Sequence, residues 1–196
     1  DEILVVTGGN SAGDFLRLLG NGKEFGLRHI NYTYQEGEGG IAAALSLAEY
    51  FADNDKMVVI LGDNIIEGNI RKAVDAFRAQ KDGARILLKE VPDPQRFGVP
   101  VFEGDRIVRI DEKPSKPASN FAVIGIYMYD SRVFDFIKTL RPSERGELEI
   151  TDVNNFYIRE KRIAWDVLDG WWSDAGTFDS LQYASNMVAK TGANKV

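Results

Sequence analysis

The feature that most constrains this chain's fold is the regular alternation of short apolar runs with helical patterns in its first half. Apolar runs typical of buried strands cover residues 2–7, 57–61 and 84–91, and residues 30–35 alternate like a strand. Helical spacing of apolar residues lies between them, at residues 12–20, 39–52 and 70–80. Strands separated by helices in this order are typical of βαβ units. The sequence therefore predicts an α/β fold, with a Rossmann-like, mostly parallel mixed sheet flanked by helices.

The second half of the chain changes in character after Val91. Residues 96–114 read as short strands joined by a turn at Gly104 and Asp105, and residues 120–130 form a long β-rich run. Helices are predicted at residues 131–140, at residues 147–160 and from Thr177 onward, with a strand at residues 163–169. We expect a small antiparallel β portion here, within a single domain that spans residues 1–196.

Charge and composition exclude several classes of function. The chain has 30 Asp and Glu against 24 Lys and Arg, a balance that argues against nonspecific binding to nucleic acid or to an anionic membrane. A few local cations can still hold a phosphorylated small molecule. With no cysteine and a single histidine, His29, the chain offers no zinc–thiolate site, no Cys nucleophile and no histidine metal cluster. We find no transmembrane run and no signal peptide, so a cytoplasmic location is expected.

The segment "KMVVILGDNIIEGN", residues 56–69, is the clearest candidate for chemistry. A buried strand ends there on Gly62, and the carboxylate of Asp63 and the amide of Asn64 follow directly. These residues are common in turns, but open α/β sheets also bind ligands at the carboxyl ends of their strands. A second isolated carboxylate, Asp174, precedes the last predicted helix. Two carboxylates without His or Cys nearby suit a hard cation such as Mg²⁺ that bridges phosphates.

Cationic residues near other predicted strand ends fit phosphate chemistry. "DEKP" places Glu112 beside Lys113, and "RFGV" begins with Arg96. Phosphoryl or nucleotidyl transfer needs acids for the metal and cations for phosphate charge. Each motif alone also fits a solvated turn, so the residues leave both interpretations open. The glycine-rich "VVTGGNSAGD" lacks the residues of a phosphate-binding loop, and we predict an ordinary strand-to-helix turn there.

Longer motifs identify a family. The runs "LGDN", "PQRFGV", "DEKPSKPASNFAVIGIYMYD", "RPSERGELEITDVNNFY" and "WWSDAGTFDSL" occur in order across nearly the whole chain. With them the sequence closely resembles the glucose-1-phosphate thymidylyltransferases, in the sugar-phosphate nucleotidylyltransferase superfamily. The resemblance implies the nucleotide-diphospho-sugar transferase fold. It favours the thymidylyl branch over the uridylyl and adenylyl branches.

The resemblance also implies roles for individual residues. Asp63 and Asp174 match two magnesium-binding aspartates, and Gln35 and Gly40 match the positions that read the thymine base. Asn64, in the same "LGDN" motif, is assigned to substrate binding. The positions that match the wall around the sugar hydroxyls are Gly98, Glu112, Val123 and Gly125. Lys113 and Arg145 match cations that hold the phosphate of the sugar phosphate. Val123 and Gly125 would also fit a tightly packed strand, and Arg145 an ion pair at a helix entry.

The implied reaction transfers a thymidylyl group from dTTP to α-D-glucose 1-phosphate with Mg²⁺, giving dTDP-glucose and pyrophosphate. It belongs to nucleotide-sugar biosynthesis of the dTDP-rhamnose type, and family members suggest a homotetramer. Two alternatives stay open: a uridylyl- or cytidylyltransferase for the same sugar phosphate, and a nucleotide-sugar binding protein without turnover.

One departure from the family concerns the start of the chain. Family members open with a strand and a glycine-rich loop ending in Thr-Arg, which cradles the triphosphate, whereas this sequence starts at "DEILVVT", the match to their second strand. The domain is therefore expected to be N-terminally incomplete as given. We expect two broken strand-pairing surfaces and exposed apolar residues beside them. A protein that truly lacked the loop is expected to keep the base and sugar contacts but to lose catalysis.

Overall fold

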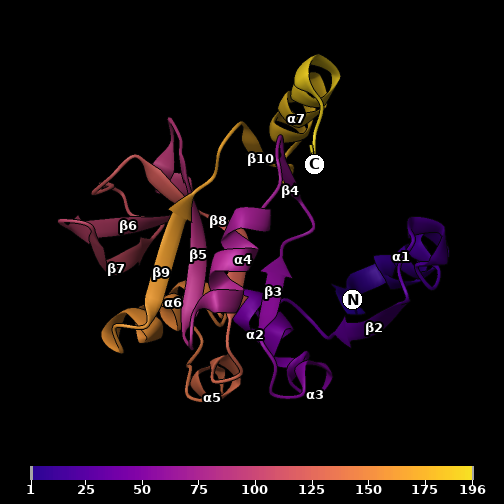
Figure 1. The fold of residues 1–196 in the computed structure, drawn as a ribbon, viewed down its shortest axis with the longest axis horizontal. Helices are drawn as coiled ribbons and strands as arrows, with labels where there is room; N and C mark the ends of the chain where they lie inside the picture. Colours follow the sequence, from indigo (N-terminus) through magenta and orange to yellow (C-terminus); the bar gives the residue numbers. More distant parts are fainter. Residues whose placement is uncertain (1, 196) are drawn as a thin grey trace. The chain divides into compact units, whose positions relative to one another are not determined.

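The computed structural model describes residues 2–195 (Figure 1). The chain divides into two compact units, one with the described residues up to Asp55 together with Ser131–Val153, the other with Lys56–Asp130 and the described residues from Asn154 onward. Each unit is built from both helices and strands, which confirms the predicted α/β class. The expectation of a single domain stays a prediction. In the described part of the chain, no helix is long and apolar enough to cross a membrane.

The first unit contains a small parallel sheet. Strands β1 (Glu2–Gly8) and β2 (His29–Gln35) pair in parallel, and helix α1 (Ala12–Leu19) connects them. The glycine-rich segment after β1 forms a short 3-10 turn, η1 (Gly9–Ser11), that leads into α1. This is the ordinary strand-to-helix turn that the sequence predicts.

The predicted helix at residues 39–52 is wrong as one element, because the chain turns within it. The structure has α2 (Ile41–Ser46) and α3 (Glu49–Ala52) instead. The amides of Leu47 and Ala48 bond carbonyls three residues back, and the Ser46 hydroxyl donates to the carbonyl of Ala43. Such tight turns and side-chain bonds to the backbone compete with a continuous α-helix. Helix α5 (Val133–Ile137) packs on α2.

The second unit is organised around a six-stranded mixed sheet with the order β7-β6-β8-β5-β9, in which β3 also pairs with β8. Its strands are β3 (Met57–Ile60), β5 (Ala84–Glu90), β6 (Gly98–Glu103), β7 (Arg106–Glu112), β8 (Phe121–Tyr129) and β9 (Ile163–Val167). Strands β5 and β9 run parallel, whereas β8 is antiparallel to β3, β5 and β6. The antiparallel share is therefore larger than the small portion that the sequence predicts. A single long strand, β8, causes this difference.

Helices cover this sheet through apolar stripes. Helix α4 (Arg71–Ala79) buries Ala73 and Phe77 in a core that also contains Leu87, Ile124, Ile126 and Met128. Figure 1 shows α4 alongside β5 and β8. Helix α6 (Ile150–Arg159) begins three residues later than predicted. Before it, the amide of Gly146 donates to the carbonyl of Ser143 in a turn, and the amide of Leu148 donates to the carbonyl of Gly39. Thr177 is the N-cap residue of helix α7 (Phe178–Thr191) and forms a capping box with Ser180.

Two three-residue strands that the sequence analysis missed form a separate ladder in the second unit. Strand β4 (Asn64–Ile66) pairs antiparallel with β10 (Trp172–Asp174), so that Asn64 lies opposite Asp174. Figure 1 shows this ladder next to α7. Three residues are too few for an alternating pattern to be recognised in a sequence. One predicted metal ligand, Asp174, ends this ladder, and the other, Asp63, directly precedes it.

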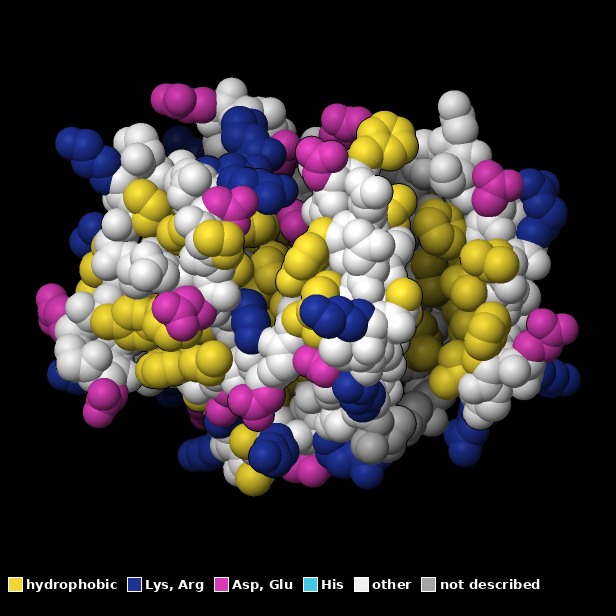
Figure 2. Space-filling model, turned by 90° about the horizontal axis from the view of Figure 1, so that it is seen from above, with side chains coloured by type: hydrophobic (Ala, Val, Ile, Leu, Met, Phe, Trp, Pro, Cys, Tyr) yellow, Lys and Arg dark blue, Asp and Glu magenta, His cyan; other side chains and the backbone are white. Residues whose placement is uncertain are grey.

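Open strand edges occur in both units. Among the described strands, β1 pairs only with β2, and β3 pairs only with β8. On β3 the side chains of Val58 and Ile60 are 41% and 56% exposed. The expectation that a missing segment leaves two broken pairing surfaces stays a prediction. Figure 2 shows one face of the molecule, on which hydrophobic side chains reach the surface among charges of both signs.

Candidate active site

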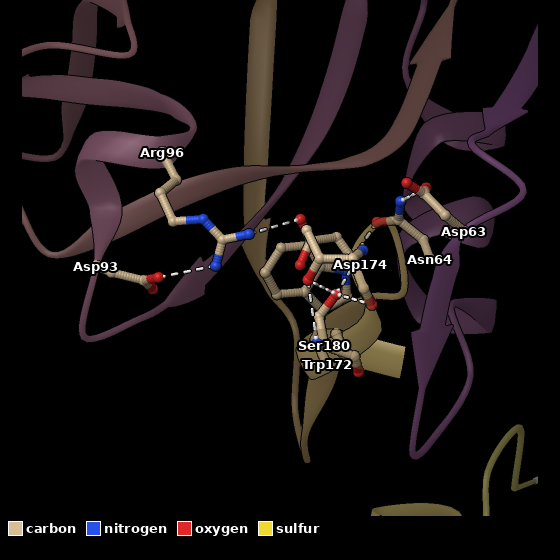
Figure 3. A network of polar contacts seen from close by, with 9 residues as sticks. Asp63, Asn64, Asp93, Arg96, Trp172, Asp174 and Ser180 are labelled. Atoms are coloured by element: carbon tan, nitrogen blue, oxygen red, sulfur yellow. Dashed lines mark hydrogen bonds and ion pairs between the residues drawn. The ribbon is translucent and has the colours of Figure 1, made fainter. Parts of the chain in front are cut away.

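The β4–β10 ladder brings together the segments that carry the two predicted metal ligands, which Figure 3 shows on either side of Asn64. Asp63 directly precedes β4, Asp174 ends β10, and the amide of Ala175 donates to the carbonyl of Asp63 over 2.7 Å. Burial raises the pKa of the Asp174 carboxyl, and the negative charge of Asp63 adds to this rise. Two carboxylates that repel each other in this way could bind a hard cation, and the metal site stays a prediction.

A guanidinium lies beside this pair. Arg96, at the end of the 3-10 turn η3 (Pro94–Arg96), has one nitrogen 2.9 Å from the Asp93 carboxylate and another 3.5 Å from that of Asp174. The hydrogen bond to Asp93 raises the pKa of the Arg96 guanidinium, and burial offsets part of this rise. The sequence suggested Arg96 only as a general cation for phosphate. Its contact with Asp174 has no sequence signal, because the two residues are 78 positions apart (174 minus 96).

The side chain of Asn64 makes three hydrogen bonds, and Figure 3 shows the partners Asp63 and Trp172. Its Nδ2 donates to Asp63 Oδ1 over 2.8 Å, while its Oδ1 accepts from the indole N–H of Trp172 over 2.7 Å and from the amide of Gly125 over 3.0 Å. The predicted role of Asn64 in substrate binding stays a prediction. Trp172 is a residue that the sequence analysis missed.

Three residues of the predicted sugar wall are neighbours in the sheet. Gly98 of β6 lies opposite Glu112 of β7 on one side and opposite Val123 of β8 on the other. The three strands thus bring together residues that are far apart in the sequence. Burial raises the pKa of the Tyr127 phenol on β8, and the charges of Glu112 and Asp63 raise it further. Glu112 and Asp63 therefore act on the same buried group.

Gly125, the fourth residue of this set, has a packing reason to be glycine. A Cβ atom there would lie 2.5 Å from Nδ2 of Asn64 and 2.8 Å from the Leu61 side chain. Its amide bonds Asn64, and its carbonyl accepts from the amide of Leu61 over 2.8 Å. The geometry favours the packed-strand interpretation for this residue.

Lys113 follows β7 with a left-handed backbone, φ 42°, which is uncommon for a residue other than glycine. Its amide donates to the carbonyl of Phe97 over 3.0 Å, which fixes it next to Gly98. Strained backbone conformations of this kind concentrate at functional sites. The local conformation is thus compatible with the predicted role of Lys113 in phosphate binding.

The remaining predicted residues lie in the first unit. Gln35 ends β2, and its Nε2 donates to the carbonyl of Gly40 over 3.2 Å. Gly40 has φ +88°, and a Cβ atom on it would lie 2.7 Å from the carbonyl oxygen of Leu148. The predicted base-reading residues are therefore in contact with each other. Only glycine fits at position 40, both for its backbone angle and for the space around it.

Arg145 lies in the loop before α6. Its guanidinium is 2.8 Å from the Glu147 carboxylate and 3.6 Å from that of Glu149. These contacts are the helix-entry ion pair that the sequence analysis left open as an alternative. The role of Arg145 in phosphate binding stays a prediction.

Comparison with known proteins supports one family. Residues 1–191 match the family model described as nucleotidyl transferase. The chain is 41% identical over 191 residues to the glucose-1-phosphate thymidylyltransferase of Neisseria meningitidis, covering 95% of this chain and 66% of that protein. Across the curated relatives the covered share of the relative ranges down to 52%. The chain thus spans about half to two thirds of the length of the curated relatives it matches.

Solved structures agree with this assignment. A Bacillus anthracis protein described as a glucose-1-phosphate thymidylyltransferase, in complex with sucrose, superposes with a TM-score of 0.89 at 50% identity. The match covers 94% of this chain and 74% of that one. A UDP-glucose pyrophosphorylase in complex with UDP-glucose gives a TM-score of 0.83 at 23% identity, with 97% and 81% covered, and shows the shared fold alone. The chain therefore belongs to the nucleotidyl transferase family.

Proposed function

We propose that the protein transfers a thymidylyl group from dTTP to α-D-glucose 1-phosphate, releasing pyrophosphate. The observation that carries this proposal is the backbone bond from Ala175, next to Asp174, to Asp63, together with the bond from Gly125 to Asn64, which links this pair to the strand β8 that also carries Val123. Family membership and the printed names of relatives at about 40% identity support the choice of substrates.

In the proposed reaction, a phosphate oxygen of glucose 1-phosphate attacks the α-phosphorus of dTTP. The new P–O bond forms as the bond from the α-phosphorus to the bridging oxygen breaks, and pyrophosphate leaves with the bonding electrons. No covalent enzyme intermediate is required. The contribution of the protein is then to position the reactants in line and to neutralise charge.

A divalent cation fits the donor set of Asp63 and Asp174. In the described residues no group of three or more His, Cys, Asp and Glu side chains could hold a metal. The two carboxylates would therefore share the cation with water and substrate phosphates, which is the usual coordination of Mg²⁺. When bound, Mg²⁺ supplies charge neutralisation at the α-phosphate and the leaving group.

The other residues have roles in binding. Glu112 would accept hydrogen bonds from sugar hydroxyls, and the backbone groups of Gly98 and Val123 would add further bonds. Lys113 and Arg145 would hold the phosphate of the sugar. The amide of Gln35 can donate to and accept from the thymine edge, with Gly40 beside it. In this proposal the protein works in the cytoplasm as a homotetramer, and it supplies nucleotide-sugar biosynthesis of the dTDP-rhamnose type.

The primary test is pyrophosphate release from dTTP and glucose 1-phosphate with Mg²⁺. We expect turnover that the Asp174→Asn variant loses. A folded protein that binds both substrates without releasing pyrophosphate would favour the non-catalytic alternative.

Competition among dTTP, UTP and CTP tests the choice of nucleotide. We expect dTTP to be preferred, and the Gln35→Ala variant to lose much of that preference. A preference for UTP or CTP in the parent protein would identify the uridylyl or cytidylyl alternative. Full selectivity in the variant would refute the role of Gln35.

Substitutions of Lys113 and Arg145 test whether these side chains bind the phosphate of the substrate or serve only the structure. Lys113→Met and Arg145→Met are each expected to raise KM for glucose 1-phosphate more than KM for dTTP. If Arg145 serves only its ion pairs with Glu147 and Glu149, the Arg145→Met variant will lower the melting temperature and leave KM unchanged.

A further inference from the structure

The side-chain amide of Asn64 can adopt only one orientation in its surroundings. Its Oδ1 faces two groups that can only donate, the indole N–H of Trp172 at 2.7 Å and the backbone N–H of Gly125 at 3.0 Å. A flipped amide would set its N–H₂ group against both donors. The Nδ2 group must therefore point the other way, toward Asp63, whose Oδ1 accepts from it over 2.8 Å.

This amide in turn restrains the Asp63 carboxylate. Oδ1 of Asp63 accepts from Asn64, while Oδ2 lies 3.4 Å from where a Cβ atom on Gly176 would be. The second oxygen thus faces the segment that follows Asp174. The backbone bond from Ala175 to the Asp63 carbonyl holds the same two segments together.

Trp172 is itself held firmly in the core of the second unit. It is 9% exposed and belongs to the hydrophobic cluster that contains Ile66 and Phe77. The ring of Phe97 packs edge-on against it with centroids 5.3 Å apart. An indole fixed on its apolar sides presents its N–H group in a fixed direction. Figure 3 shows this group directed at Asn64.

We propose that Trp172 and Asn64 are positioning residues, a relay that orients the Asp63 carboxylate for a divalent cation. The inference rests on the proposed function, since it takes Asp63 as a metal ligand. Partners that hydrogen-bond a ligating carboxylate commonly change metal affinity by about 10- to 100-fold. Trp172 contributes through its N–H group, and Asn64 transmits the restraint.

The test measures binding of Mn²⁺ alone, by electron paramagnetic resonance, without nucleotide or sugar phosphate. A residue that acts only by touching substrate leaves this affinity unchanged. Trp172→Phe removes the N–H donor and keeps an aromatic ring, and we expect it to weaken Mn²⁺ binding about tenfold. An unchanged affinity in a folded Trp172→Phe variant would overturn the proposal.

The adjacent tryptophan provides a matched control. Trp171 is 7% exposed, and its indole N–H donates to the Thr191 hydroxyl on α7 over 2.7 Å, away from Asn64. Trp171→Phe therefore loses a similar volume and one buried hydrogen bond. We expect it to lower the melting temperature and to leave the Mn²⁺ affinity unchanged. Equal losses of affinity in both variants would show a general effect of destabilisation and overturn the proposal.

A double-mutant cycle tests the route through Asn64. If Trp172 acts through this amide, adding Trp172→Phe to Asn64→Ala causes no further loss of Mn²⁺ affinity. Additive losses would overturn the relay. Should Trp172→Phe fail to fold, Asn64→Ala alone must still weaken Mn²⁺ binding, and an unchanged affinity there would also overturn it.

Asp63→Asn separates this inference from the proposed function. If the parent protein binds Mn²⁺ no better than this variant, then Asp63 is not a metal ligand, and both the metal assignment and the relay fail. If Asp63→Asn abolishes Mn²⁺ binding while the Trp172 and Asn64 variants bind normally, only the relay fails.

Discussion

Asp174 carries an electrostatic penalty in the metal-free fold. Burial raises the pKa of its carboxyl above the ordinary 3.8, Arg96 opposes the rise, and Asp63 and Asp93 add to it. The folded protein therefore holds this proton more tightly than the unfolded chain does. The ionised carboxylate destabilises the fold above the raised pKa, and this effect disappears below the ordinary value.

We expect the Asp174→Asn variant to have a slightly higher melting temperature than the parent at pH 7 without metal, because the penalty is removed. The difference should vanish as the pH falls through 3.8. Saturating Mg²⁺ should reverse the order, since a cation at 100 times its Kd stabilises only the parent, by about 2.7 kcal/mol. Differential scanning calorimetry at several pH values checks this. Equal stabilisation of the parent and the Asp174→Asn variant by Mg²⁺ would show that Asp174 is not a ligand of the cation.

The side chain of Lys56 caps the C-terminus of helix α4, although Lys56 lies outside that helix. It precedes β3, and its Nζ donates to the carbonyls of Phe77 and Arg78 over 3.1 and 3.2 Å and also to that of Gln80, at the C-terminus of α4. A cation at this end interacts favourably with the last carbonyls and the helix dipole. The interaction ties α4 to the strand that leads toward Asp63.

Replacement of Lys56 by methionine keeps most of the aliphatic stem and removes the charge. We expect the free energy of unfolding to fall by about 1–2 kcal/mol, measured by urea denaturation. Lys72→Met, on an exposed position of α4 itself, is the control and should change it by less than about 0.5 kcal/mol. Equal effects of the two changes would mean that the cap contributes nothing.

Helix α6 is joined to β8 by buried hydroxyl groups. Tyr157 donates to Oδ1 of Asp130 over 2.7 Å, and Tyr129 donates to Oδ1 of Asn154 over 2.6 Å. The other oxygen of Asp130 accepts from the amide of Gly83 over 2.6 Å. Asp130 is only 8% exposed, so the bonds from Tyr157 and Gly83 satisfy a carboxylate that water reaches poorly.

Tyr157→Phe removes one of these bonds without changing the ring. We expect it to destabilise the fold by about 1–3 kcal/mol, because a buried carboxylate oxygen loses its partner. Tyr183→Phe, at a residue 48% exposed, is the matched control and should have little effect. Chemical denaturation measures both, and KM for either substrate should not change. A loss below about 0.5 kcal/mol for Tyr157→Phe would show that water replaces the hydroxyl.

At the scale of the whole molecule, the buried tyrosines limit stability at high pH. Burial raises the pKa of the Tyr127 and Tyr129 phenols, and their other charged and ionisable neighbours raise it further. The unfolded chain releases these protons near pH 10, whereas the folded protein keeps them. The unfolded state then binds fewer protons, so stability must fall as the pH rises.

We therefore expect full stability below about pH 10 and cooperative alkaline unfolding above it. Absorbance of phenolate should show part of the 7 tyrosines ionising only as the circular dichroism signal is lost. The double variant Tyr127→Phe/Tyr129→Phe should unfold at higher pH than the parent if it folds. Ionisation of all tyrosines before unfolding would contradict the burial of these two.

Patterns along the chain were enough to predict the α/β class, most long elements and the family. Strands such as β5 and β8 have enough residues for their apolar pattern to be recognised, and motifs such as "LGDN" lie within single segments. These features depend on local patterns that remain visible along the chain. The roles that the family resemblance implies for Gln35, Gly40, Gly98 and Glu112 stay predictions, although the fold brings Gln35 to Gly40 and Gly98 to Glu112.

The residues around the two predicted metal ligands are brought together by contacts between distant segments. The ladder of β4 with β10, the bond from Trp172 to Asn64 and the ion pair of Arg96 with Asp174 all join segments that are about 80 to 110 residues apart. The physical reason is that hydrogen bonds and ion pairs form between groups that are close in space, whereas periodicity reports only on neighbours along the chain.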